Sequence, residues 1–202
     1  AFGSGMTQSV NQAYEAAEQL RAEFPGQRLE VIDSLCSSSG YGLLVDGAAD
    51  LRDADKSMDE TIDWVMAWRK RVHHQFYSTD LQYFRRGGRV SGAAAFFGTM
   101  LNIKPVLHVD DAGHLIPMEK VRGRKASLDA LVAHMEKDAV DPASQTVFIS
   151  HGDCRADAEY VADLVREKFG TQDIRIHSIG PVIGSHSGPG TVALFYLGRT
   201  RG

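Results

Sequence analysis

The stretch TVFISHGDCRADAEYVADLVREKFGTQDIRI, residues 146–176, decides the fold class. It opens with a short apolar run at 147–149, which is typical of a buried strand. Apolar side chains then recur at three- and four-residue steps from Ala158 to Phe169, which predicts a helix that ends at Gly170. A second apolar run follows at 174–176. Strand, helix and strand in this order indicate an α/β protein.

The same alternation continues on both sides of this unit. Ser57 and Glu60 form a capping-box pattern that marks one helix start, and Pro105 indicates an edge strand or the start of a strand. The predicted strands cover residues 29–32, 76–78, 104–109, 115–121 and 191–196, and the predicted helices cover residues 10–24, 43–48, 57–69, 81–86, 90–101 and 128–135. The break near residues 73–80 is the best candidate for a domain boundary.

The composition argues against several classes of protein. The chain has 202 residues, 43% of them hydrophobic, and a formal net charge of −4. It is too apolar for a disordered chain, and its acidic excess argues against a nucleic-acid partner. Its most apolar stretch, residues 93–101, is far shorter than the ~20 residues that span a bilayer, and residues 1–9 lack the pattern of a secretory signal. Because Cys36 and Cys154 are too few for a disulfide framework, we expect reduced thiols in a cytoplasmic protein.

Glycines gather at several places, and the first cluster, Gly3-Ser4-Gly5, precedes the helix predicted at 10–24. Glycine in such clusters indicates tight turns or backbone close to a ligand. Free amides at a helix start, together with the Ser4 and Thr7 hydroxyls, suit an anion. The commoner role of such hydroxyls is to cap the helix. Both interpretations are open on these residues.

His186 lies in a second glycine-rich stretch, residues 184–190, which we expect to form a loop. An imidazole there can donate a hydrogen bond to a carboxylate or phosphate. An ordinary polar loop residue is an equally good interpretation. None of the other histidines has a metal-ligand spacing, and His151 with Cys154 has no second ligand pair, so we expect no metal site.

Two short basic clusters, RRGGR at 85–89 and RGRK at 122–125, are able to hold a phosphate or an acidic partner. A solvated helix end explains them equally well. The apolar stretch 93–101 has the residues of a ligand cavity, although such stretches are more often plain core.

The sequence argues against the commoner enzyme classes. Ser4, Asp33 and His186 are the residue types of a hydrolase triad, but Ser4 lacks the G-x-S-x-G elbow. No P-loop and no G-x-G-x-x-G following a strand is present to hold a nucleotide. The hydrolase interpretation is therefore weak, and we identify no catalytic residue.

Several ordered motifs resemble the DegV family of bacterial fatty-acid-binding proteins over nearly the whole chain. FRRGGRV at 84–90 is similar to the family's Y-L-x-K-G-G-R-I, LNIKPVL at 101–107 to L-N-I-K-P-I-L, residues 121–125 to K-x-R-x-x-K, IGSHSGPG at 183–190 to I-G-x-H-x-G-P-G, and SGMTQS at 4–9 to S-G-T-Y-Q-S. Asp33 and Ser34, followed by Ser38, match a further family stretch.

The resemblance implies a two-domain α/β fold. Residues 1–73 would be the latter part of an N-terminal parallel-sheet domain, and residues 74–202 a C-terminal α/β domain with a mixed sheet. The family's D-S-T/S-x-D-L strand end and S-Q-P-S turn do not occur here. We therefore expect the chain to begin after the family's N-terminal segment, without half of the carboxylate site.

The resemblance also implies a ligand site. Ser4 stands where the family's carboxylate-binding serine stands, although Met6 replaces the usual threonine. A buried carboxylate needs hydrogen-bond donors, and an acyl chain needs apolar walls. The resulting candidate ligand-binding residues are Ser4, Gly5, His186, Phe97, Leu101 and Ile183.

The implied function is to bind a long-chain fatty acid, without a cofactor, and to present it to a separate ATP-dependent fatty acid kinase. Arg89 and Arg122 match family arginines suited to steadying an acyl phosphate or docking that partner. The alternative is a small-metabolite-binding subunit of a dihydroxyacetone-kinase-like phosphotransfer system that uses His186. A third possibility is a docking subunit whose ligand only regulates a partner.

Overall fold

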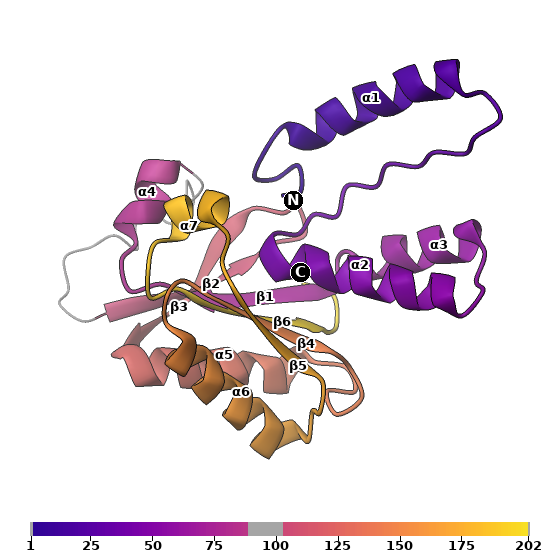
Figure 1. Ribbon diagram of the computed structural model, residues 1–202. Helices are drawn as coiled ribbons and strands as arrows, with labels where there is room; N and C mark the ends of the chain where they lie inside the picture. The colour runs from indigo at the N-terminus through magenta and orange to yellow at the C-terminus, as the bar shows by residue number, and fades with distance from the viewer. Residues whose placement is uncertain (1, 89–102, 202) are drawn as a thin grey trace.

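The computed structural model describes residues 2–88 and 103–201, and these residues form one mixed six-stranded sheet covered by helices on both faces (Figure 1). The strand order is β3-β2-β1-β6-β4-β5. The strands are β1 Val72–Tyr77, β2 Ile103–Val109, β3 Leu115–Arg122, β4 Val147–His151, β5 Ile174–Ser178 and β6 Val192–Leu197. The helices are α1 Ser9–Glu23, α2 Ser38–Asp53, α3 Met58–Trp68, α4 Gln82–Gly87, α5 Arg124–Asp138, α6 Arg155–Phe169 and α7 Pro181–Ser187.

The unit expected at residues 146–176 is confirmed. β4 pairs in parallel with β5, and Ile149 lies opposite Ile176. α6 connects the two strands and ends at Gly170, which adopts a left-handed conformation with φ 73°. The strand pairs β1/β2, β2/β3, β1/β6 and β4/β6 are antiparallel, so the α/β class and the mixed sheet are both confirmed.

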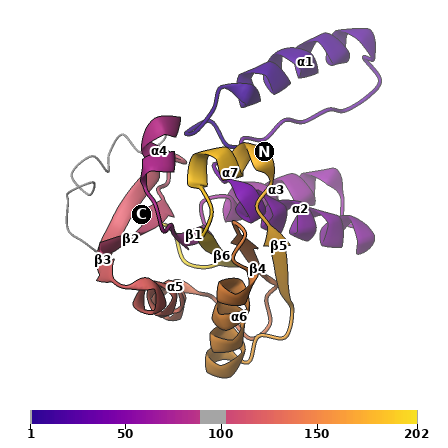
Figure 2. The same cartoon turned by 60° about the vertical axis from the view of Figure 1, so that its left-hand side comes forward.

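The two faces of the sheet bury separate apolar cores. α5 and α6 cover one face, where Leu131, Met135 and Val165 pack against the strands. α2 lies on the opposite face, where its Leu43 and Leu44 pack in the cluster that includes Phe76. Figure 2 shows α4 and α7 together beyond this second face, away from α5 and α6.

α3 begins with the predicted capping box. The Glu60 amide donates to Ser57 Oγ at 3.2 Å, and the Ser57 amide donates to the Glu60 carboxylate at 2.9 Å. These two bonds satisfy amides that the helix itself leaves free.

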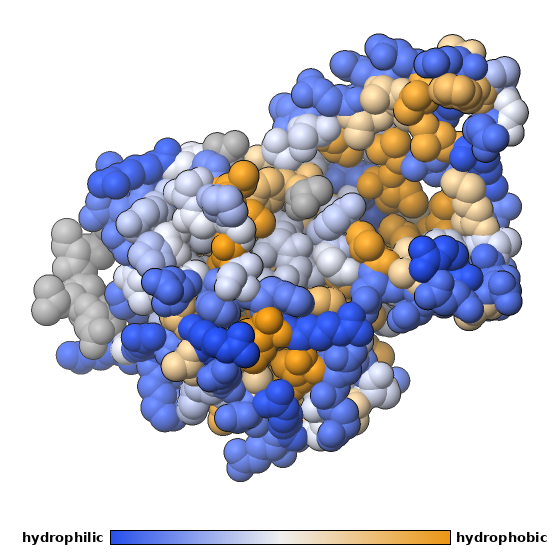
Figure 3. Space-filling model, in the orientation of Figure 1, coloured by the Kyte–Doolittle hydropathy of each residue, from blue (hydrophilic) through white to orange (hydrophobic). Residues whose placement is uncertain are grey.

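α1 forms as predicted, but the described residues leave most of its apolar face uncovered. Only Ala17 of this helix is buried, whereas Leu20 and the following Phe24 are 43% and 50% exposed. Tyr41 and Val45 of α2 are exposed as well. Figure 3 shows the resulting apolar surface between α1 and the α2–α3 pair.

The strand predicted at 29–32 does not form. Residues 29–37 have no regular secondary structure, and none of the strands in the described ranges pairs with them. The Arg21 guanidinium of α1 donates instead to the Leu29 carbonyl at 2.6 and 3.1 Å. Residues 2–71 thus contribute only helices and connecting chain to the described fold.

Pro105 is the third residue of a strand that is not at the edge of the sheet. β2 lies between β1 and β3, but its pairing with β1 is confined to Val106 and Leu107. Pro105 pairs only with Lys120 of β3, so its missing N–H falls where β1 offers no partner.

Two other expectations concern boundaries. The helix predicted at 90–101 lies outside the described residues. The proposed division between residues 73 and 74 falls inside β1, and it stays a prediction.

Within the described ranges, no helix combines the length and the apolar character needed to cross a membrane.

Candidate functional site

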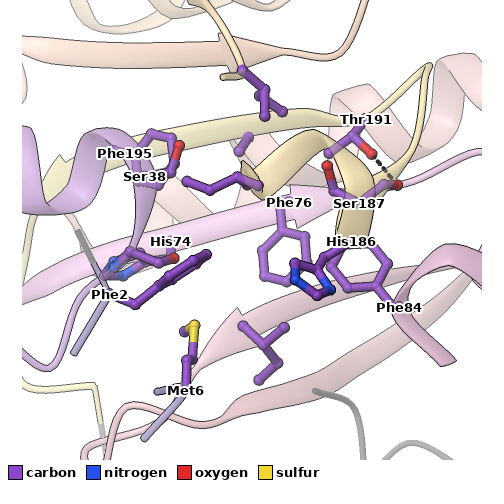
Figure 4. A pocket seen from close by; sticks show the side chains of 15 residues that line it. Phe2, Met6, Ser38, His74, Phe76, Phe84, His186, Ser187, Thr191 and Phe195 are labelled. Atoms are coloured by element: carbon purple, nitrogen blue, oxygen red, sulfur yellow. Dashed lines mark hydrogen bonds between the residues drawn. The ribbon is translucent and has the colours of Figure 1, made fainter. Parts of the chain in front are cut away.

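A cavity of about 60 Å³ lies on the α2 side of the sheet, where β1 and β6 meet α7 and the N-terminal loop (Figure 4). It is lined by Phe2, Met6, Ser37, Ser38, His74, Phe76, Phe84, Leu115, Ile179, Ile183, His186, Ser187, Thr191, Ala193 and Phe195. Most of these side chains are apolar, and the polar ones gather at two sides: His186 and Ser187 on one, and His74 and Ser38 on the other.

The floor of the cavity follows from the pairing of β1 with β6. His74 lies opposite Phe195, and Phe76 lies opposite Ala193. Because alternate side chains of a strand share a face, these four side chains point to the same side of the sheet. The floor is therefore fixed by two buried central strands.

The short helix α7 places His186 and Ile183 at the cavity. The predicted loop is wrong at this point: Pro181 occupies the first turn of a helix that ends at Ser187. The His186 ring lies directly against α4, since a Cβ added to Gly87 would stand 2.3 Å from His186 Nδ1. Gly87, the first glycine of the RRGGR cluster, is therefore required, because a side chain at this position would collide with the imidazole.

His74 on the opposite side is held as a neutral ring. Its Nδ1–H donates to the Val72 carbonyl at 3.0 Å, and its Nε2 accepts the Ser37 amide at 3.2 Å. Burial is the main reason that its pKa lies well below the ordinary value, and the nearby Arg201 lowers it further. His74 thus contributes a rigid, uncharged wall.

The loop before α1 reaches the cavity through Phe2 and Met6, while Ser4 between them is exposed. The Ser4 amide donates to Asp33 Oδ1 at 3.1 Å. A Cβ on Gly5 would stand 2.4 Å from the Gly113 backbone, so close packing of two backbones requires this glycine. Ser4 does not cap α1, because the N-cap position is Gln8 and this helix has no side-chain cap hydrogen bond. The ligand contact expected for Ser4 stays a prediction.

The other predicted site residues divide into two groups. Arg122 is exposed at the end of β3, outside the cavity lining. Arg89, Phe97 and Leu101 lie outside the described residues.

The residues that sequence reasoning missed are His74, Phe76, Phe84, Phe195 and Ser187. The first two alternate on β1 and would have been found from the strand pattern, had its start been placed at Val72. Phe195 depends on the β1–β6 register, which nothing local in the sequence specifies.

Neither cysteine is a candidate nucleophile. Burial raises the pKa of the Cys36 thiol to about 12 and that of Cys154 to about 11, so both are protonated near neutral pH. Both are free of disulfides. The part of the chain that the structure describes contains no group of three or more side chains arranged to hold a metal ion.

A family model described as "Uncharacterised protein, DegV family COG1307" matches residues 2–199. The chain belongs to the DegV family. A DegV domain-containing protein of Clostridium perfringens is 43% identical over 201 residues, which are 100% of this chain and 69% of that protein. One from Streptococcus pyogenes is 35% identical over 98% of this chain and 68% of its own length.

Solved DegV structures share the fold described above. Bacillus subtilis DegV, described as a fatty acid binding protein, is 25% identical with a TM-score of 0.81, and the match covers 98% of this chain and 69% of that one. The Streptococcus pneumoniae Fatty Acid Kinase (Fak) B3 protein loaded with linoleic acid is 23% identical with a TM-score of 0.88, and the match covers 97% and 69%. At this identity the second match shows the DegV fold alone.

Proposed function

We propose that this DegV chain binds a long-chain fatty acid, with the acyl chain along the cavity between β1, β6, α4 and α7. The observation that carries the proposal is the apolar cavity with polar groups gathered at its sides, in a chain of a family whose Bacillus subtilis member is a fatty acid binding protein. Each methylene group removed from water stabilises such a complex by ~0.8 kcal/mol.

The carboxylate is assigned to the side of the cavity that carries His186. A buried carboxylate must be paired with donors, and a histidine is able to donate from either ring nitrogen, depending on its protonation state. Phe2 and Met6 bring the Ser4 loop to the same cavity, which supports Ser4 and Gly5 as further contacts of the head group. Phe76, Phe84 and Ile183 supply apolar walls.

A long chain needs more room than the cavity offers. A volume of about 60 Å³ holds only a few water molecules, since one water needs roughly 10–15 Å³ by this measure. Lining side chains must move aside to admit an acyl chain, and Met6, with its flexible thioether, is suited to this.

The same small volume favours a second candidate function. A small-metabolite-binding subunit of a dihydroxyacetone-kinase-like phosphotransfer system would use His186 and leave the apolar walls as plain core. Such a ligand would fit without movement of the lining. The length of the bound molecule therefore separates the two candidates.

Ligand identity is tested by extracting purified protein with organic solvent and measuring the extract by mass spectrometry. We expect a long-chain fatty acid in a ratio approaching one per chain. Delipidated protein should then take up palmitate in isothermal titration calorimetry. Protein that carries no acyl chain and takes up none would overturn the proposal, and a small carbonyl compound bound at His186 would establish the second candidate.

The proposal extends to a partner. The chain would present its fatty acid to an ATP-dependent fatty acid kinase and perform no chemistry itself, as the name of the Streptococcus pneumoniae relative suggests. Exposed Arg122 is the described residue that we assign to this contact, and Arg89 is assigned to it by sequence alone. Arg122→Glu should lower the rate of acyl phosphate formation with the kinase several-fold and leave palmitate affinity unchanged. Equal rates for the two proteins would remove Arg122 from the interface.

A further inference from the structure

Ser187, the last residue of α7, has a buried hydroxyl without a partner. The residue is 3% exposed, and its Oγ has no hydrogen-bond partner among the described residues. It lines the same cavity as His186. A buried hydroxyl is favourable only when it is paired, because burial removes its hydrogen bonds to water. An unpaired hydroxyl at a cavity wall therefore indicates a ligand that pairs with it.

The surrounding backbone holds this residue firmly. The Ser187 carbonyl accepts hydrogen bonds from Ser78 Oγ at 3.0 Å and from Thr191 Oγ1 at 2.8 Å. A Cβ on the next residue, Gly188, would stand 2.4 Å from the Tyr83 ring, so the chain is also packed closely on that side. The end of α7 is thus secured by its backbone, and the side-chain hydroxyl takes no part in securing it.

Three other polar side chains of the lining have partners within the protein. His74 uses both ring nitrogens, and Ser38 Oγ donates to Ser150 Oγ at 3.4 Å. The Thr191 hydroxyl donates to the Ser187 carbonyl. Within the described part of the lining, the unpaired buried polar atom belongs to Ser187, on the side of the cavity that carries His186 (Figure 4).

We infer that the Ser187 hydroxyl donates a hydrogen bond to the carboxylate of the bound fatty acid, next to His186. The inference rests on the proposed function. His186 and Ser187 line the same side of the cavity, and one carboxylate, with two oxygens and about four acceptor positions, is able to accept hydrogen bonds from both. Ser187 is then a specificity-determining residue that favours an ionised head group over an apolar chain end.

The test compares palmitate binding to delipidated wild type, Ser187→Ala and Ser185→Ala by isothermal titration calorimetry at pH 8. Ser185 is the matched control, because it lies on the same helix, is exposed, and donates to the Val182 carbonyl at 2.8 Å. We expect Ser187→Ala to weaken binding about ten-fold or more, since hydrogen bonds to charged groups are the stronger ones. Ser185→Ala should stay within about two-fold of wild type, the size of change that surface substitutions usually cause.

Two further measurements separate a ligand contact from a structural role. Without fatty acid, Ser187→Ala should melt at or above the wild-type temperature, because no protein hydrogen bond is lost. With palmitate labelled with ¹³C at its carboxyl carbon, the pKa of the bound carboxyl should rise in Ser187→Ala, because a donor to the charged form is removed.

The outcomes distinguish this inference from the proposal it rests on. Wild type that binds palmitate no more tightly than Ser187→Ala overturns the role of Ser187 and leaves fatty acid binding intact. A weaker Ser187→Ala that also melts at a lower temperature, with an unchanged carboxyl pKa, overturns it as well, since Ser187 is then structural. Wild type that binds no fatty acid overturns both.

Discussion

Gly87 and His186 show how a single residue shapes the site. The α4 glycine leaves just enough room for the imidazole, and any side chain at position 87 would meet Nδ1 at 2.3 Å. Real Cβ atoms do not approach so closely, so the ring has to move. Gly87 of the RRGGR motif therefore leaves the space for a histidine that lies almost a hundred residues later in the sequence.

Gly87→Ala is expected to weaken palmitate binding at least several-fold, because it displaces the ring assigned to the carboxylate. The free energy of unfolding should change by less than about 1 kcal/mol, since alanine favours the helix by a similar amount. Calorimetry and urea denaturation measure the two effects.

Gly42→Ala in α2 is the matched control. An added Cβ there meets no atom within 4 Å, so the substitution should stabilise the protein by about 0.5–1 kcal/mol and leave binding unchanged. Gly87→Ala with wild-type affinity would show that the position of His186 does not matter for the ligand.

At the scale of elements, β1, β6 and α7 supply most of the cavity lining that belongs to strands and helices. β1 and β6 supply His74, Phe76, Ala193 and Phe195 through their register, and α7 supplies the polar side of the cavity. Helix ends such as the start of α3 are set by local side chains instead.

Ser57→Ala removes the side-chain acceptor of the α3 capping box. We expect the free energy of unfolding to fall by about 1 kcal/mol, the usual contribution of such a cap. Urea denaturation measures the loss. Because Ser57 is exposed and absent from the cavity lining, palmitate affinity should be unaffected. A stability equal to that of wild type would mean that the box adds nothing in solution.

Ala193→Leu places extra volume in the cavity floor opposite Phe76. Long-chain acids should bind at least ten-fold more weakly, whereas octanoate should lose less, because a shorter chain needs less of the cavity. Competition of both acids against a fluorescent fatty acid measures the difference. Equal losses for the two acids would place the acyl chain elsewhere. Circular dichroism and a thermal melt confirm that the variant is folded.

At the scale of the whole molecule, the sheet buries histidines that must stay neutral. The rings of His73 and Tyr196 stack with centroids 4.9 Å apart, and His108 lies 5.2 Å from His73. Burial lowers the pKa of His108 to about 3 and that of His73 and His74 below the ordinary value. Burial therefore disfavours protonation of these three histidines in the folded protein.

Stability should therefore fall in mild acid. In the unfolded chain His73, His74 and His108 bind protons below pH 6.5, whereas in the folded protein these three rings do so only at a lower pH. The unfolded state therefore gains the free energy of protonation first. For His108 alone the free energy of unfolding should fall by about 2 kcal/mol between pH 7.5 and pH 5. Urea denaturation across this range measures the slope.

An independent measurement concerns the rings themselves. The imidazole NMR signals of His108 should keep their neutral shifts down to pH 5. A free energy of unfolding that does not change from pH 7.5 to pH 5 would contradict the burial of these rings in neutral form.

The sequence by itself determined the elements whose cause is local. Apolar periodicity predicted α6 and β4, the Ser57–Glu60 pair predicted the start of α3, and Gly170 predicted the end of α6. Motif resemblance also indicated His186 and Ile183, and both line the cavity. These features can be predicted from the sequence because each depends on a short run of neighbouring residues.

Only the tertiary structure decided what depends on distant segments. The apolar run at 29–32 is not a strand, because no described strand lies beside it and Arg21 takes its carbonyl. Phe195 reaches the cavity because β6 pairs with β1. Ser78 and Thr191 bind the Ser187 carbonyl, while the Ser187 hydroxyl is buried without a partner. Register and burial arise from contacts between residues far apart in the chain, so a local pattern determines the element while packing determines the site.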